Sequence, residues 1–371
     1  MKRKLIFAAF LIGAIAFTGC QKEAIKTLDN SSQNTTAENK SVKVIVPEFD
    51  MNKYNQLVAD NEARLARIED QASRGPKNSI TVPTDYATIQ EAVDAASEGA
   101  NIFVNEGSYT EDVLISTPGL KLQAKEGVEL IGSLTILEGA DNVTIKKFNI
   151  NTSGTAIHGF GVSGGQIVQN TITSEIGGEG VHLQSCDGFS IKNNSVTGTQ
   201  LGIFLSSVSF QGNGTANDNT VLNNTVSGNS FAGIYFQGSC QNNTIVNNTV
   251  SEGSEFSNGG ISLFGVPDFL GAPEFLEGEC NNNIVKNNNC TQHYAGISLI
   301  FTANNNTIGP NNTTNENLLY GILLYGGASD NNIFNNTALN NVDCDIVVWD
   351  DGIPSQNNTF SNNTYDCYQE L

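Results

Sequence analysis

The chain contains no arginine after Arg74, and its 18 basic residues stand against 38 acidic ones. Nine of the acidic residues precede residue 76, so the remainder of the chain carries 29 acidic residues against seven lysines. A surface of this sign repels phosphate backbones. We therefore expect no nucleic-acid partner, and a polyanionic ligand would need a metal ion to mediate its binding.

The chain also lacks an apolar run long enough for a typical membrane span. The segment MKRKLIFAAFLIGAIAFTGC (1–20) has a basic start, a short apolar stretch and small residues before Cys20, which together indicate a secretion signal. FTGC (17–20) resembles a bacterial lipobox, although Phe17 stands where leucine is usual. We predict a signal peptide over 1–19 and a lipid on Cys20, so that a membrane is a partner through this anchor. The expected location is the outer membrane, facing the cell surface or the periplasm.

The segment between the predicted lipid anchor and the repeats is expected to consist of a tether followed by one helix or linker. Residues 20–53 are polar and poor in aromatic residues, which predicts a flexible tether. Residues 54–75 are expected to form one amphipathic helix or linker that ends at Arg74-Gly75-Pro76. The apolar spacing behind this prediction is carried by Tyr54, Leu57, Val58, Asn61, Leu65 and Ile68.

A short asparagine-rich phrase recurs from about residue 141 to the C-terminus. QNNTIVNNTV (241–250) followed by GGISL (259–263) is one clear copy, and NDNTVLNNTV (217–226) followed by AGIYF (232–236) is another. Most copies are spaced by about 22–30 residues, a period typical of solenoids. Each copy offers three short apolar strands with no room for a helix between them. Because a single coil cannot bury its own apolar face, residues 76–371 are predicted to form an all-β, single-stranded right-handed parallel β-helix.

Alignment of the copies predicts columns of side chains that point into the solenoid. The first column is Ile191, Val221, Ile245, Ile284, Ile308, Ile333 and Phe360. The second is Val196, Val226, Val250, Cys290, Thr314, Ala338 and Tyr365. The third is Ile157, Val181, Ile203, Ile234, Ile261, Ile297, Ile322 and Ile346. The asparagine pairs between strands, such as Asn247/Asn248, suit a left-handed bend, and their stacked amides can bond along a column.

Cysteine is scarce, with six residues beyond Cys20. An even number suits disulfides in an exported chain. Cys240 and Cys280 occupy the same position in consecutive coils, and neighbouring strands lie about 4.8 Å apart, which suits a bridge. Cys344 and Cys367 form a second candidate pair near the C-terminal end. The spacings contain no strong zinc signature, so structural bridges or buried thiols are expected in place of catalysis.

SITVPTDYATIQEAVDAASEGANIFVNEGSYTEDVLI (79–115) resembles the N-terminal cap of pectin-lyase-like β-helix proteins, in which a helix covers the first coil. Ile89, Ala92, Val93 and Ala96 supply an apolar stripe for that helix. The repeats also resemble the NosD-like and general right-handed β-helix region families, and together the resemblance covers 79–371. This superfamily hosts lyases, hydrolases, esterases, epimerases and non-enzymes, so the resemblance implies a fold and no single reaction.

The chain lacks residues that several enzymes of this superfamily use in their reactions. Many lyases of pectate and alginate type use Arg or Lys, and the solenoid has no Arg. The Asn-Thr-Asp, Asp-Asp and Gly-His-Gly set of polygalacturonases is missing. The NosD-like label implies copper handling, yet Met1 and Met51 are the only methionines and only three histidines exist. A copper site is therefore poorly supported.

The two variable positions of the Gly-Ile-x-Leu-x strand are expected to point outward. The first outward column is His158, His182, Phe204, Tyr235, Ser262, Ser298, Leu323 and Val347. The second is Phe160, Gln184, Ser206, Gln237, Phe264, Ile300, Tyr325 and Trp349. Exposed rings beside Gln and Ser would suit a glycan, whereas strand propensity or a covering loop is the alternative. The substrate-binding candidates are Phe204, Gln237, Phe264, Tyr325, Trp349 and Asp350.

The catalytic candidates lie in the first outward column and in an insertion. His158 and His182 are one coil apart, and with Tyr235 they could act as base and charge stabiliser in a β-elimination. They could equally bind a metal or be ordinary surface residues. The insertion GVPDFLGAPEFLEGE (265–279) adds Glu274 and Glu277, which could act as acid, base or Ca²⁺ ligands or belong to a merely decorative lid.

The sequence therefore predicts an envelope-anchored lipoprotein that binds a polysaccharide and, if it is an enzyme, cleaves it as a lyase or glycoside hydrolase. A non-catalytic glycan-binding or structural scaffold is the rival hypothesis. A NosD-like accessory role is a further alternative, as is an ice-binding face along the column Thr144, Ser190, Thr220, Thr244, Thr307 and Thr359.

Overall fold

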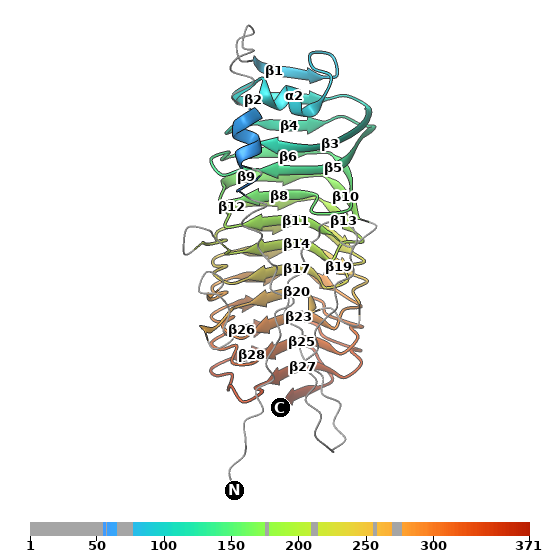
Figure 1. The fold of residues 1–371 in the computed structure, drawn as a ribbon. Coiled ribbons are helices and arrows are strands. Elements are labelled where there is room, and N and C mark those ends of the chain that lie inside the picture. Colours follow the sequence, from blue (N-terminus) through green and yellow to red (C-terminus); the bar gives the residue numbers. More distant parts are fainter. Residues whose placement is uncertain are drawn as a thin grey trace, which may run out of the picture.

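The computed structural model describes residues 55–56, 58–64, 77–174, 178–208, 214–254, 258–268 and 277–371. Its strands stack in parallel along one axis into an elongated solenoid, with the N-terminal coils at one end and the C-terminal coils at the other (Figure 1). The predicted all-β parallel β-helix is therefore confirmed. No helix in these ranges is long and apolar enough to cross a membrane.

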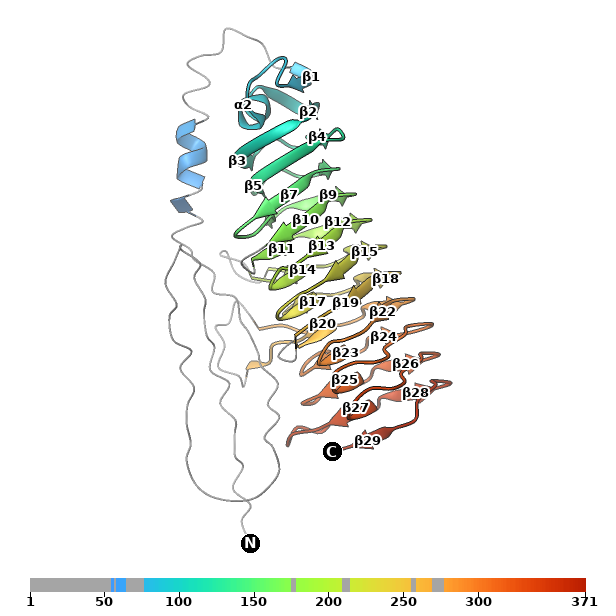
Figure 2. The same ribbon diagram turned by 90° about the vertical axis from the view of Figure 1, so that its right-hand side faces the viewer.

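One parallel sheet of twelve strands takes one strand from each coil and forms one wall of the solenoid (Figure 2). Its strands are β1 (Lys77–Val82), β2 (Ala96–Val104), β4 (Lys121–Ala124), β6 (Val143–Lys146), β9 (Ser163–Val168), β12 (Asp187–Lys192), β15 (Thr220–Leu222), β18 (Thr244–Val246), β21 (Ile284–Lys286), β24 (Thr307–Ile308), β26 (Asn332–Phe334) and β28 (Thr359–Ser361).

The second sheet has 17 strands and supplies the other two walls. The long strands β3 (Gly107–Ile115) and β5 (Val128–Ile136) pair along their full length, and β5 then pairs with strands of both walls. The second wall consists of β7 (Asn149–Thr152), β10 (Thr171–Ser174), β13 (Ser195–Thr197), β16 (Thr225–Ser227), β19 (Thr249–Ser251) and β22 (Asn289–Cys290). The third wall consists of β8 (Ile157–Phe160), β11 (Glu179–Gln184), β14 (Leu201–Ser206), β17 (Ala232–Gln237), β20 (Gly259–Phe264), β23 (Ala295–Ile300), β25 (Tyr320–Tyr325), β27 (Cys344–Trp349) and β29 (Tyr368–Glu370).

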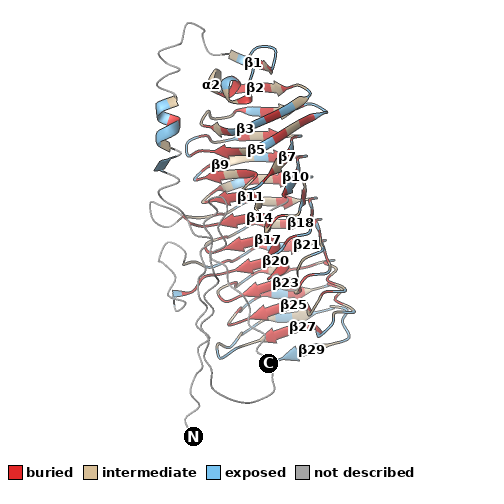
Figure 3. Ribbon diagram, turned by 45° about the vertical axis from the view of Figure 1, so that its right-hand side comes forward, coloured by how far each residue is buried: buried red, intermediate tan, exposed pale blue. Residues whose placement is uncertain are grey.

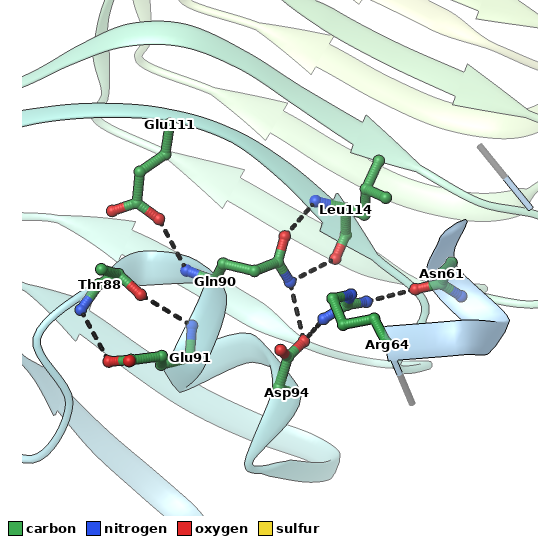
Figure 4. A network of polar contacts seen from close by, with 8 residues as sticks. All are labelled: Asn61, Arg64, Thr88, Gln90, Glu91, Asp94, Glu111 and Leu114. Atoms are coloured by element: carbon green, nitrogen blue, oxygen red, sulfur yellow. Dashed lines mark hydrogen bonds and ion pairs between the residues drawn. The ribbon is translucent and has the colours of Figure 1, made fainter. Parts of the chain in front are cut away.

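A short helix, α2 (Ile89–Asp94), covers the first coil as predicted. Thr88 caps it through a reciprocal pair of bonds with Glu91, and its apolar side buries Ile89 and Val93. The carboxylate of Glu111 accepts hydrogen bonds from the backbone N–H groups of Ile89 and Gln90, which satisfies donors that a helix start leaves open. Figure 4 shows the bond to Gln90. The helix ends at Asp94, so Ala96 belongs to β2 and contacts the core from there.

The helical segment that precedes the solenoid meets this cap. Residues 55–56 and 58–64 are helical, and Arg64 forms an ion pair with Asp94 while it also bonds to Asn61 (Figure 4). The rest of the predicted 54–75 helix and the whole of 1–53, with Cys20, lie outside the described residues.

The core of the solenoid is built from columns in register, as the repeats predict. The eight residues of the third predicted column pair from coil to coil and are all fully buried. One member of the other columns is placed wrongly by the alignment, and one is exposed for another reason. Val285, and not Ile284, pairs with Ile245, because Asn283 holds the ladder position before it; Ile284 is 38% exposed. Tyr365 is 41% exposed because it lies in the last, uncovered coil.

The two residues of each asparagine pair have different structural roles. The first of each pair has a left-handed backbone, as in Asn223 (φ 54°) and Asn247 (φ 56°). The second joins a buried ladder: Asn248 Oδ1 accepts from the backbone N and Nδ2 of Asn224, and Asn248 donates in the same way to Asn288. Stacked amides along a column were predicted, and they are confirmed.

The cysteines fulfil one of the two predicted bridges. Cys344 and Cys367 form a disulfide with a Cα–Cα distance of 5.1 Å. The predicted Cys240–Cys280 bridge is wrong, because both are free thiols that hydrogen-bond to each other. Burial, reinforced by Cys280, raises the pKa of Cys240 far above its ordinary value. The thiolate that oxidation requires is therefore scarce.

Candidate functional site

The third wall is buried on both of its faces, which distinguishes it from the rest of the solenoid. All six residues of β14, β17, β20, β23 and β25 are buried, and Figure 3 shows these strands in continuous red. By contrast, strands of the first wall alternate between buried and accessible residues, as in β15 and β18. The outward columns thus form a second apolar cluster outside the solenoid core.

This burial corrects the predicted exposed aromatic face. Phe204, Tyr235 and Phe264 are fully buried and Tyr325 is 2% exposed, so none offers a ring to solvent in this structure. The reason is that turn residues next to the strands fold over the columns: Phe231 meets Tyr235 edge-on at 5.6 Å. Phe301 packs in the same way against Phe264 and Tyr325. Trp349 and Asp350 alone among the predicted glycan contacts remain partly exposed.

The first outward column is a continuous stack of rings at its N-terminal end. The ring centroids of His158 and His182 lie 4.7 Å apart, and those of His182 and Phe204 lie 4.2 Å apart. Phe204 is followed by Tyr235 at 5.4 Å. The expectation that the two histidines are neighbours is confirmed. Tyr235 continues the same stack, yet Phe204 separates it from His182.

The side chain of His182 is held between an acid and a hydroxyl. Its Nδ1 lies 2.9 Å from Oε2 of Glu179, at the start of the same strand. Its Nε2 lies 3.1 Å from Oγ of Ser206, at the end of the next strand, β14. The contact is diagonal, because His182 pairs in register with Phe204 while Gln184 pairs with Ser206. Glu179, His182 and Ser206 therefore form one hydrogen-bonded chain across two coils.

The charge state of Glu179 determines which groups donate and which accept in this series of hydrogen bonds. Burial alone would raise the pKa of its carboxyl. Attraction to His182, the hydrogen bond with His182, attraction to His158 and a 2.8 Å bond from Thr155 outweigh that effect and lower the pKa to about 2. A carboxylate can only accept, so we assign the proton of His182 to Nδ1. In the neutral imidazole Nε2 then carries a lone pair directed at the hydroxyl of Ser206.

Two glutamines flank Ser206 in the second outward column. Gln184 pairs in register with Ser206 from one side and Gln237 from the other. Both are at most 2% exposed. Within the described part of the chain, Nε2 of Gln184 has no hydrogen-bond partner, and neither polar atom of the Gln237 side chain has one. The hydroxyl of Tyr235 is likewise buried and unpartnered.

The polar part of this wall is short. In the coils that follow, Ser262 and Ser298 bond to each other at 2.9 Å, so both hydroxyls have a partner. Leu323 and Val347 then continue the column as apolar residues. Polar groups with unused bonding capacity therefore gather between β11 and β17, which we take as the candidate site.

The two remaining catalytic candidates belong to the insertion. Glu274 falls outside the described residues. Glu277 is partly exposed at the base of the insertion, next to an antiparallel bridge between Val266 and Gly278. No hydrogen bond or ion pair joins it to the histidine stack within the described ranges. Those ranges also contain no group of three His, Cys, Asp or Glu side chains that could hold a metal ion.

Sequence reasoning placed Ser206 beside Gln184 and Gln237 but gave it no role, and it did not single out Glu179. The repeat does contain a signal for Glu179. Glu179 aligns with Leu201 and, one coil further, with Ala232, so it is a carboxylate in a column of apolar residues. What could not be read from the alignment is the diagonal contact between His182 and Ser206.

Comparison with known proteins agrees with this fold. A family model described as "Right handed beta helix region" matches residues 125–268, and no curated protein matches the chain. The chain is similar to the solved structure of the Dettilon tailspike protein at 16% identity and a TM-score of 0.55, over 79% of this chain and 62% of that one. It is also similar to the A-module of the Azotobacter vinelandii mannuronan C-5 epimerase AlgE4, at 14% identity and a TM-score of 0.53, over 82% and 91% of the two chains. These similarities establish a shared fold and confirm the resemblance to right-handed β-helix proteins.

Proposed function

We propose that this protein binds a polysaccharide at the polar part of its third wall, between β11 and β17, and modifies it there. The observation that carries the proposal is the set of unused polar atoms on Gln184, Gln237 and Tyr235 in an otherwise apolar surround. Each such atom costs about 1–3 kcal/mol when it is buried without a partner. Such groups call for a specific explanation, and an absent ligand is one that fits their clustering here.

The chemistry of these groups favours a sugar. An amide side chain both donates and accepts, which matches the paired donor and acceptor character of hydroxyls. The buried rings of Phe204 and Tyr235 pack in the neighbouring outward column and hold the strands that carry the amides. A net charge of −20 disfavours a polyanion, so an uncharged glycan is the preferred class. The similar mannuronan C-5 epimerase is named for a polysaccharide, which supports a glycan ligand in general but not the uncharged class.

The test measures binding of uncharged polysaccharides to the detergent-solubilised full chain on affinity gels. Gln237→Ala should weaken retention of the bound glycan about tenfold, the effect of losing one or two good hydrogen bonds. Gln369→Ala is the matched control, because Gln369 lies in the same wall but is exposed in the terminal strand β29. Equal retention of the two variants and the wild type would remove the site from consideration.

A non-catalytic scaffold is the second candidate, and the burial of Phe204, Phe264 and Tyr325 favours it. A wall sealed by its own turns needs no ligand to be stable. This reading predicts that no glycan in a broad panel is retained and none is altered, while the folded protein persists in the envelope.

Attachment to the envelope through Cys20 is part of the same proposal and rests on the signal-like segment 1–20. Cys20→Ala should move the protein from the membrane fraction to the soluble fraction. Proteolysis of intact cells then separates surface display from a periplasmic orientation. A Cys20→Ala protein that still sediments with membranes would contradict lipidation.

A further inference from the structure

We propose that Ser206, His182 and Glu179 form a nucleophilic triad that removes ester-linked acyl groups from the glycan; the identity of the polymer rests on the function proposed above. The reaction class is acyl transfer to water. The substrate class is an O-acylated polysaccharide, and no metal ion or cofactor takes part in the proposed chemistry.

The geometry meets the requirements of such a triad. A nucleophile must lie within hydrogen-bond reach of its base, and a third group must orient that base. Here the two distances are 3.1 Å from Ser206 Oγ to His182 Nε2 and 2.9 Å from His182 Nδ1 to Glu179 Oε2. Among the described residues, His182 is the hydrogen-bond partner of the Ser206 hydroxyl. Ser206 is fully buried, His182 is 5% exposed and the Glu179 side chain is 20% exposed.

The three residues lie where polar side chains give way to apolar ones along the stack, since His158 and Gln184 hold the positions of His182 and Ser206 one coil earlier. In the coil after His182, the equivalent positions of Glu179 and His182 hold Leu201 and Phe204. Two coils after Ser206, its position holds Phe264, and Ile300 follows. Within their two coils, Glu179, His182 and Ser206 are three different polar residues that bond to one another, whereas each asparagine ladder repeats one residue type at one position.

The flanking amides complete the site. An acyl transfer passes through a tetrahedral oxyanion, and preorganised Asn or Gln side chains can stabilise it. Gln184 and Gln237 lie one strand to either side of Ser206, about 4.8 Å away along the stack. The Nε2 atoms of both are unpartnered, so their N–H groups are available to an oxyanion formed at Ser206.

The reaction can be written with every bond accounted for. Ser206 Oγ gives its proton to His182 Nε2 and forms a bond to the ester carbonyl carbon, whose π electrons move to oxygen. The oxyanion collapses, the bond from carbon to the sugar oxygen breaks, and His182 returns the proton to that oxygen. Water then attacks the acyl-serine, again losing a proton to His182. Collapse releases the carboxylic acid and restores the hydroxyl of Ser206.

The same geometry argues against a β-elimination by His182 and Tyr235. The lone pair of His182 Nε2 is engaged with the hydroxyl of Ser206, so it is not free to take a proton from carbon. Burial, together with the nearby thiols of Cys280 and Cys240, raises the pKa of Tyr235 well above its ordinary value and removes tyrosinate as a base. Acyl transfer uses the contact between His182 and Ser206 and needs no base from Tyr235.

The test uses the detergent-solubilised full chain with two probes. p-Nitrophenyl acetate and a chemically O-acetylated, otherwise uncharged polysaccharide report hydrolysis, and a fluorophosphonate reports a reactive serine, which peptide mass spectrometry assigns. We expect labelling at Ser206. Ser206→Ala should lower hydrolysis at least about a hundredfold and abolish labelling.

Two further variants separate catalysis from folding. Ser262→Ala removes another fully buried serine of this wall, bonded to Ser298 and not to His182, and should retain labelling and hydrolysis. Glu179→Gln should keep the fold by circular dichroism yet lower the rate of labelling at Ser206, because a neutral amide no longer fixes the tautomer of His182. Labelling as fast as in the wild type would overturn the role of Glu179.

The outcomes distinguish this inference from the proposed function. Wild-type protein that binds a glycan through Gln237 but shows neither labelling nor acyl release overturns the triad and leaves the binding site standing. Labelling at Ser206 with no glycan retention supports the triad and refutes the proposal that the substrate is a polysaccharide. A labelled serine other than Ser206 also overturns the triad.

Discussion

Gly253 lies against His293 so closely that a Cβ atom on the glycine would meet Nδ1 of the imidazole at 2.0 Å. His293 is fully buried, neither ring nitrogen has a hydrogen-bond partner within the described residues, and its backbone N–H donates to Asn317. It therefore stands where the next two coils hold the ladder residues Asn317 and Asn341. The glycine provides the room that the larger ring needs.

Gly253→Ala should destabilise the protein by about 1–3 kcal/mol, because the methyl group overpacks a site filled by the ring of His293. The same substitution in a His293→Asn background should cost much less, since the shorter side chain vacates the space. Urea unfolding of the two single variants and the double variant measures the coupling. Additive effects would show that the contact has no energetic consequence.

His293 should also make stability depend on pH. Burial lowers its pKa from 6.5 to about 4, so between these values the unfolded chain binds a proton that the folded chain does not. Stability is therefore full above about pH 6.5 and falls as the pH is lowered toward 4, by about 3 kcal/mol in total. Thermal unfolding of the wild type and His293→Asn from pH 4 to 7 checks this. Parallel curves for the two proteins would contradict it.

The two residues of an asparagine pair should respond differently to the same change. Asn248→Gly removes bonds to Val221, Asn288 and Asn224 from a buried ladder and should cost about 3 kcal/mol or more. Asn247→Gly, at the exposed left-handed position next to it, should be nearly neutral, because glycine adopts that backbone without strain. Comparable losses at both positions in urea unfolding would refute this division of roles.

Phe204→Ala tests whether the outward column is a second core. A fully buried phenylalanine stacked between His182 and Tyr235 should cost about 3–5 kcal/mol when truncated. Phe204→Leu preserves most of the apolar volume and should cost less than half as much. If Phe204 were instead an exposed sugar platform, truncation would change the unfolding free energy by no more than about 0.5 kcal/mol.

The oxidation state of the cysteines can be read by alkylating the protein in denaturant without reductant. Peptides with Cys186, Cys240, Cys280 and Cys290 should be alkylated, because all four are free thiols. Those with Cys344 and Cys367 should react only after reduction. An unreacted Cys240–Cys280 pair would restore the bridge that coil spacing predicts.

The stacked coils could be predicted well from the sequence because the residues that form them recur from one coil to the next. The buried column from Ile157 to Ile346 and the stacking of the asparagine amides follow from aligning copies of one phrase. The slip at Ile284 marks the limit of that method. A step of one residue inverts a strand, and two adjacent apolar residues, Ile284 and Val285, leave the alignment undecided.

The site was harder to predict because it depends on contacts that the period does not encode. Whether Phe204 is exposed depends on side chains of neighbouring turns, such as Phe231, that fold over the wall. The contact between His182 and Ser206 crosses diagonally between coils, whereas alignment compares residues that lie directly above one another. The thiol state of Cys240 depends on side-chain hydrogen bonding as well as on strand spacing.

Asp345 closes the ladder that His293 interrupts. Its Oδ1 accepts from Nδ2 of Asn341 at 2.8 Å, and its Oδ2 accepts from the backbone N–H groups of Asp366 and Cys367. The amide of a ladder asparagine donates a hydrogen bond to the next coil, whereas a carboxylate has no N–H group to donate. Duplication of whole coils within the gene could therefore lengthen this protein anywhere before Asp345 without disturbing its end. Relatives of different length should keep an acidic residue four positions after their final ladder asparagine.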